Sequence, residues 1–152
     1  MAIELQKITE KWDLTYNHAV GETASRYFYE IKENKQIFGK YCPSCKKVIV
    51  PPRSFCDSCF TDTTEWVKVA NEGVIECATI ICSPFKTLPD PPYALSYVKL
   101  DGADTAMGGY VKGIDLTNID NAMNILKIGN RIKVIFKDDR QGNVLDYWFE
   151  PV

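Results

Sequence analysis

Two cysteine pairs, Cys42-Pro43-Ser44-Cys45 and Cys56-Asp57-Ser58-Cys59, are separated by the ten residues Lys46–Phe55. Two residues between cysteines let a tight turn direct both sulfurs at one point. Two such knuckles, joined by a short hairpin, place four thiolates in a tetrahedron. The connecting segment supplies the hairpin, because Val48–Val50 favours a strand and Pro51-Pro52 ends it. The spacing therefore predicts a structural metal site with all four cysteines as ligands.

The ligand set indicates the role of the metal. A closed four-cysteine site has no open coordination position, so we expect it to stabilise the fold and not to catalyse a reaction. Zinc is the expected metal, but iron in a rubredoxin-type centre uses the same ligands, and the spacing does not separate the two. Residues 35–53 contain no acidic residue, and their basic side chains offset part of the negative charge of the thiolates. These are Lys35, Lys40, Lys46, Lys47 and Arg53.

Composition excludes several classes of protein. The chain has 152 residues, of which 45% are hydrophobic and 25% charged, so it is long enough for one ordinary domain or two very small ones and is not disordered. Eighteen basic and twenty acidic residues give a net charge of −2, which argues against a general polyanion binder. A single histidine, His18, excludes enzymes built on several histidines. The N-terminus does not resemble a signal peptide and no run is long enough to span a membrane, so we expect a cytoplasmic protein.

The N-terminal third is expected to contain an arm and one helix. In residues 1–20, Trp12, Leu14 and Tyr16 alternate with polar residues, so this arm is expected to lie extended against something. From Gly21 to Asn34, apolar residues recur at the helical spacing i, i+3, i+4, i+7. The sequence leaves open whether this aromatic face packs on its own chain or on a partner. The apolar positions are Ala24, Tyr27, Phe28 and Ile31.

The rest of the chain favours short β-strands separated by turns. Five main strands with a short helix at Ile119–Leu126, between the third and fourth, match a Greek-key barrel of the OB type; a small sandwich is the alternative. Gly108-Gly109 is interpreted as a bulge or sharp bend. The domains expected are an arm and helix at 1–36, a rubredoxin-like zinc ribbon at 37–63 and a barrel at 64–152. The predicted strands are Trp66–Val69, Gly73–Cys82, Tyr93–Leu100, Thr105–Val111, Arg131–Lys137 and Val144–Phe149.

Two cysteines lie outside the metal pattern. Cys77 shares the predicted apolar face of its strand with Ile75 and Ile81, so we expect it to be a small buried core residue. Cys82 ends the same strand. A nucleophilic cysteine requires a base, and His18 is the one histidine in the chain, so no catalytic residue is expected.

The order helix, rubredoxin-like ribbon, OB barrel resembles the DUF35 family over about residues 22–150. One departure is Lys46, where family members usually carry glycine after the first knuckle; a lysine there requires a left-handed backbone, which is unfavourable. The segments that carry the resemblance are Phe38-Gly39-Lys40-Tyr41-Cys42, Val50-Pro51-Pro52-Arg53, Cys56-Asp57-Ser58-Cys59, Gly73-Val74-Ile75-Glu76, Pro92-Tyr93-Ala94-Leu95, Val98-Lys99-Leu100-Asp101 and Ile128-Gly129-Asn130-Arg131-Ile132-Lys133-Val134.

The resemblance implies a non-catalytic subunit that forms a hetero-oligomer with a larger thiolase-like enzyme and shares CoA or acyl-CoA as a ligand. The family includes acyltransferase and aldolase subunits and the small subunit of benzoylsuccinyl-CoA thiolase, which is similar in size. On charge, Lys40, Lys46, Lys47 and Arg53 are the expected contacts to CoA or to the partner. The alternative function is nucleic-acid binding by the ribbon and barrel, with Tyr97 and Tyr110 as stacking residues. The acidic pI argues against it, and membrane binding is not expected.

Three surfaces are expected to bind the partner, because exposed apolar groups on a lone chain are disfavoured. They are the helix face with Tyr27, Phe28 and Ile31, the proline-rich loop Pro84–Pro92, and the run Tyr147-Trp148-Phe149, in which at least one ring should face outward.

Overall fold

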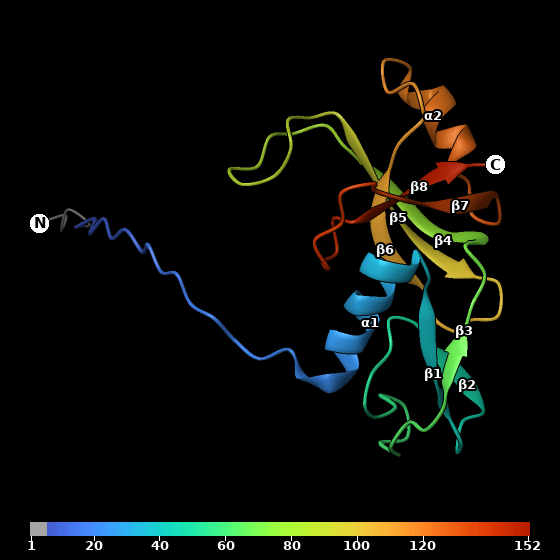
Figure 1. Ribbon diagram of the computed structural model, residues 1–152. Coiled ribbons are helices and arrows are strands. Elements are labelled where there is room, and N and C mark those ends of the chain that lie inside the picture. Colours follow the sequence, from blue (N-terminus) through green and yellow to red (C-terminus); the bar gives the residue numbers. More distant parts are fainter. Residues whose placement is uncertain (1–5) are drawn as a thin grey trace, which may run out of the picture.

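The protein was analysed as a computed structural model that describes residues 6–152. An extended arm leads into helix α1 (Gly21–Asn34), which is followed by a small three-stranded sheet and then by a barrel (Figure 1). The architecture is mainly β with one N-terminal helix, a four-cysteine ribbon and a closed five-stranded barrel, as the sequence predicts. Neither helix in the described part of the chain is long and apolar enough to cross a membrane.

Helix α1 covers the residues that the apolar spacing predicts. Tyr27 and Ile31 are buried in the main core, and Phe28 packs against that core. The aromatic face therefore packs on its own chain, and the expectation that it is a partner surface is wrong. The helix is too short to be stable alone, so its apolar stripe must be buried on the nearest available core.

The ribbon sheet has the strand order β2-β1-β3, with β1 (Phe38–Cys42) in the centre. Strand β2 (Lys47–Ile49) follows the first knuckle and pairs antiparallel with β1. Strand β3 (Trp66–Lys68) lies beyond residue 63, the expected end of the ribbon, and nonetheless pairs with β1 along its other edge. The chain thus returns to the ribbon sheet after the second knuckle before it enters the barrel.

The barrel strands are β4 (Glu72–Ile81), β5 (Tyr93–Leu100), β6 (Met107–Val111), β7 (Arg131–Phe136) and β8 (Tyr147–Pro151). They close in the order β4-β5-β6-β8-β7, and β6 and β8 are parallel where they meet. Helix α2 (Ile119–Ile125) lies between the third and fourth barrel strands. This is the order of an OB barrel, and its closure excludes the small sandwich that the sequence left as an alternative.

The barrel differs from the prediction at the start of β8. The strand begins at Tyr147 and not at Val144, because a tight turn precedes it. The carboxylate of Asp146 accepts hydrogen bonds from the backbone N–H groups of Gln141, Gly142 and Asn143, which holds this segment out of the ladder. In β8 itself Tyr147 and Phe149 point into the core while Trp148 is half-buried on the other side, consistent with the expected outward ring.

A β-bulge lies in β4 and not at the predicted glycines. The register with β5 shifts between Ile75 and Cys77, which reverses the side-chain alternation beyond that point. Ala78 and Ile80 therefore pack against the core, and Cys77 is exposed, so the expectation that Cys77 is buried is wrong.

At Gly108-Gly109 the pairing with β5 runs without a shift. The second glycine has a different purpose: a Cβ on Gly109 would lie 2.8 Å from Cε2 of Phe149. The absence of a side chain at Gly109 therefore leaves room for the buried ring of Phe149 in the barrel interior.

The ribbon is joined to the barrel by hydrogen bonds as well as by the chain. Thr105 Oγ1 accepts a hydrogen bond from the N–H of Val50 at 2.7 Å and donates to its carbonyl oxygen at 2.8 Å. The N–H of Val48 donates to Asp104 Oδ2 at 2.8 Å, and the N–H of Asp104 donates to the Val48 carbonyl at 2.9 Å. In addition, Val50 belongs to the same core cluster as the barrel residues. The metal site is thereby held in a defined position relative to the barrel.

Candidate metal centre

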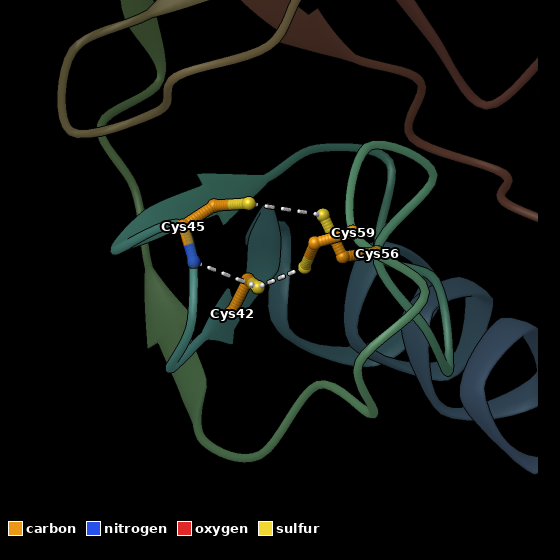
Figure 2. A group of neighbouring side chains, drawn as sticks. All are labelled: Cys42, Cys45, Cys56 and Cys59. Atoms are coloured by element: carbon orange, nitrogen blue, oxygen red, sulfur yellow. Dashed lines mark hydrogen bonds between the residues drawn. The ribbon is translucent and has the colours of Figure 1, made fainter.

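The four predicted cysteines come together at the tip of the ribbon (Figure 2). Cys42 ends β1, Cys45 lies in the turn before β2, and Cys56 and Cys59 form the second knuckle. Their sulfur atoms all lie within 4.8 Å of one another, with 3.6 Å between Cys42 and Cys59 and 3.8 Å between Cys45 and Cys56. Sulfurs at about 2.3 Å from a tetrahedral metal ion lie about 3.8 Å apart. The four cysteines therefore form a metal site of the zinc-ribbon type.

Both knuckles have the same local geometry. The Lys46 N–H donates to the Cys42 carbonyl at 2.8 Å, and the Phe60 N–H donates to the Cys56 carbonyl at 2.9 Å. The residue after each pair is left-handed, with φ of 57° at Lys46 and 58° at Phe60. The left-handed lysine that the resemblance implies is confirmed. A non-glycine residue in the left-handed region is conformationally unfavourable. Both turns that direct the sulfurs inward contain such a residue.

Hydrogen bonding makes the sulfurs unequal. The Thr61 side chain and backbone lower the pKa of the Cys59 thiol to about 5. Hydrogen bonds with Cys59 and Cys56 raise the pKa of Cys45 to about 12. These hydrogen bonds therefore favour the thiolate form at Cys59. A cluster that stabilises negative charge in a half-buried position suits a bound cation.

The basic residues predicted beside the site lie in different surroundings. In the pairing of β1 with β2, Lys40 lies opposite Ile49, and Lys47 lies opposite Cys42. Directly opposite residues share a face of the sheet, as do Lys40 and Cys42, which are two residues apart on β1. Lys40 and Lys47 are therefore on the same face. Lys40 Nζ also stands 5.5 Å from the centre of the Trp66 ring. Lys46 is in the first knuckle.

Arg53 is separate from the lysines, on the ribbon segment that faces the barrel. It lines a small pocket of about 230 Å³ together with Asp57 and Thr105. Its guanidinium lies 3.3 Å from the Asp57 carboxylate. This acid lies just beyond the acid-free stretch, residues 35–53, so it partly neutralises the positive patch that the sequence predicts.

Outside the cluster, the described residues contain no assembled catalytic group. Cys77 and Cys82 are both exposed, and Cys82 Sγ donates a weak hydrogen bond to the carbonyl oxygen of Ile80 at 3.9 Å. His18 lies on the exposed arm, where its ring centre is 5.9 Å from that of Tyr16.

Several supporting residues were not identified from sequence. Thr63 Oγ1 donates to the carbonyl of Arg53 at 2.6 Å and so ties together the two ends of the second knuckle. Buried Gln36 donates from Nε2 to the Val69 carbonyl at 2.9 Å, which joins the end of α1 to the end of β3. Thr105 acts in the same way on Val50. Single polar residues in loops carry no periodic signal, so only three-dimensional contacts identify them.

Comparison with known proteins agrees with this geometry. Residues 34–65 match the family described as ChsH2, rubredoxin-like zinc ribbon domain. A chain of the structure described as "Ltp2-ChsH2(DUF35) aldolase" is similar in fold with a TM-score of 0.62 and 18% identity, covering 88% of this chain and 98% of that one. A DUF35 protein of unknown function from Sulfolobus solfataricus is similar with a TM-score of 0.62 and 19% identity, covering 87% of each chain. The chain therefore combines a ribbon that matches the ChsH2 zinc-ribbon family with the fold of DUF35 proteins.

Proposed function

We propose that this protein is a non-catalytic subunit of an acyl-CoA enzyme complex, in which it binds a larger thiolase-like subunit in the cytoplasm and supports CoA binding. The observation that carries the proposal is the fold match over 88% of the chain to a component of an "Ltp2-ChsH2(DUF35) aldolase". Two features of the described residues favour a supporting role: the metal site is closed by four cysteines, and neither other cysteine has a base.

The metal in this proposal is zinc, and its role is structural. Of the side chains in the ribbon-tip cluster, Ile49 is the one apolar residue that is not a cysteine. One buried isoleucine contributes roughly 1.5–3 kcal/mol, whereas a structural zinc in a small domain contributes about 10–16 kcal/mol. The metal thus supplies most of the stability of the knuckles. Elemental analysis of untagged protein distinguishes zinc from iron.

For CoA, the proposed contacts are Lys40, Lys46, Lys47 and Arg53. Arg53 is the most specific of them, because it lines the pocket between ribbon and barrel and its present partner, Asp57, is an exposed acid. Exposed ion pairs contribute little, so a phosphate can take the place of the Asp57 carboxylate at small cost. A bidentate contact from guanidinium to phosphate is stronger than the pair it replaces.

The test is co-expression with a thiolase-like subunit sought among its genomic neighbours, followed by light scattering and an assay of thiolytic cleavage of acyl-CoA. We expect a stable hetero-oligomer that is active, and little activity from either chain alone. In the complex, Arg53→Ala should raise KM for acyl-CoA about tenfold, the effect of losing one charge-assisted hydrogen bond. Lys68→Ala, an exposed lysine on β3, is the matched control and should leave KM unchanged. Full activity from either subunit alone would contradict the proposal.

Nucleic-acid binding remains the second candidate because Tyr97, on β5, is 60% exposed. Tyr110 is half-buried and its ring centre lies 5.8 Å from that of Tyr93, so it is less available for stacking. Single-strand binders use successive stacking platforms, and one exposed tyrosine provides a single one. Micromolar binding of single-stranded DNA at physiological salt, unaffected by CoA, would establish this candidate in place of the first.

A further inference from the structure

The described part of the arm, residues 6–20, carries apolar side chains that the rest of the chain does not bury. Trp12, Leu14 and Tyr16 are each at least 70% exposed. The arm runs away from the helix and the barrel (Figure 1). Its contacts are local, such as the 3.9 Å ion pair between Lys11 and Asp13. Large apolar groups in one short segment are unfavourable in water and typical of a surface that binds another molecule.

The arm has the pattern of a strand that lacks a sheet. When the arm is paired as a strand, the alternation places Trp12, Leu14 and Tyr16 on one side and Asp13 and Thr15 on the other. In residues 6–19 no backbone N–H or carbonyl bonds to the folded body of the described chain. Such a segment can supply main-chain hydrogen bonds and alternate side chains to an exposed sheet edge, which is the general basis of strand addition.

The chain's own sheets offer few places for this strand. The barrel is closed, so it has no free edge. The ribbon sheet has two outer edges, one on β3 and one on β2. The edge of β2 is partly taken by Asp104, which exchanges hydrogen bonds with Val48. An unpaired segment with few free sheet edges on its own chain is suited to pair with a sheet edge on another protein.

The share of this chain that matches the DUF35 fold leaves a remainder about as long as the arm. The DUF35 chain from the aldolase structure is covered over 98% of its length by 88% of this chain, which leaves about 18 residues here without a counterpart. The arm is about that long. A segment of this length is therefore available for a purpose separate from the shared fold.

We propose that the arm binds the larger subunit as an added β-strand, with Trp12, Leu14 and Tyr16 in apolar pockets beside an exposed sheet edge. This inference rests on the proposed function, since it assigns the partner's binding segment. Three apolar side chains in one short strand form a concentrated anchor of the kind that dominates binding energy in protein interfaces.

The test compares two triple variants of the full-length chain in binding to the purified thiolase-like subunit. Trp12→Ala, Leu14→Ala and Tyr16→Ala together should weaken binding by at least 100-fold, the loss expected for removing several anchoring side chains. The matched control, Asp13→Ala, Thr15→Ala and Asn17→Ala, changes the opposite side and should alter Kd less than threefold. Both variants change residues outside the folded body, so their melting temperatures should equal that of the wild type.

Hydrogen exchange provides the second readout. In the complex, alternate backbone amides between residues 10 and 18 should exchange at least tenfold more slowly than in the isolated chain. If both variants bind as tightly as the wild type, the arm assignment is overturned while the complex itself stands. If the wild-type chain does not bind the subunit, the proposed function fails first.

A third result would also overturn the assignment. The barrel mouth has an apolar pocket of about 320 Å³ lined by Tyr93, Tyr110 and Trp148. Protection of the arm in the isolated chain, lost in the apolar variant, would show that the arm packs on its own chain, with this pocket as the first candidate site, or, if light scattering gives a dimer, on a second copy.

Discussion

Replacing Cys42 by serine should melt the metal knuckles and leave the barrel folded. Cys42 is fully buried and ends the central strand of the ribbon, so its sulfur is fixed by β1. The ribbon tip and the barrel have separate clusters of buried side chains, and the tip cluster consists of the four cysteines and Ile49. Loss of the metal therefore removes most of what holds the tip and nothing that holds the barrel.

The expected magnitude follows from the number of ligands. A structural zinc contributes about 10–16 kcal/mol, so one of four thiolates accounts for roughly 2.5–4 kcal/mol. This corresponds to a loss of metal affinity of about 100- to 1,000-fold. Cys77→Ser is the matched control: the side chain is exposed on the bulged strand, and the change should cost less than about 0.5 kcal/mol.

Elemental analysis and hydrogen exchange together check this prediction. Cys42→Ser should contain less metal than the wild type, and the amides of Lys46 and Phe60, which bond to Cys42 and Cys56 carbonyls, should lose protection. Amides of the barrel strands should keep theirs. The reasoning is wrong if the metal-depleted variant keeps its knuckle amides protected. It is equally wrong if the barrel and the knuckles unfold in one transition.

Two stability predictions follow from the barrel. Gly109→Ala should destabilise by about 1–2 kcal/mol in urea unfolding, because its Cβ would meet Phe149 at 2.8 Å and overpacking outweighs the gain in backbone entropy. Gly108→Ala, whose Cβ would lie 3.4 Å from the Tyr97 ring, should stay within about 0.5 kcal/mol of the wild type. Burial alone would raise the pKa of Asp146, but backbone N–H donors from residues 141, 143 and 142 outweigh it and hold the pKa below its usual value. A depressed folded-state pKa stabilises above the ordinary aspartate pKa of about 3.9, so the stability that Asp146 provides should be lost as the pH falls from about 5 through the folded-state pKa. Asp146→Asn should remove that pH dependence and lower stability at pH 7; an unchanged acid-unfolding profile would contradict the assignment.

Patterns with a fixed spacing were read correctly from the sequence. The Cys-x2-Cys pairs have one geometric solution for four converging sulfurs, and the helical stripe in α1 fixes both its bounds and its buried face. What that stripe packs against was not predictable, because Tyr27 and Ile31 pair with core residues far along the chain. Periodicity identifies an apolar face but does not identify its neighbour.

The predictions fail where a local irregularity interrupts the alternation of inward and outward side chains or the strand itself. At the bulge in β4, a single extra residue reverses inside and outside, so Cys77 is exposed although perfect alternation predicts burial. Strand β8 begins later than predicted, although the apolar residues Val144 and Leu145 favour a strand. Their backbone instead belongs to the turn that Asp146 organises. A side chain bonding to its own nearby backbone competes with the ladder in a way that propensity does not detect.

The junction between ribbon and barrel gives the structural metal a functional consequence in the proposed complex. Thr105 holds both backbone groups of Val50, and Asp104 holds both of Val48, so β2 cannot shift without breaking contacts to the β5–β6 loop. Arg53 follows three residues after Val50 and lines the pocket that also includes Thr105. The position of the guanidinium therefore depends on two supports, the knuckle that begins at Cys56 and the loop that anchors β2. If Arg53 contacts CoA, loss of the metal should weaken CoA binding although CoA itself does not contact the metal.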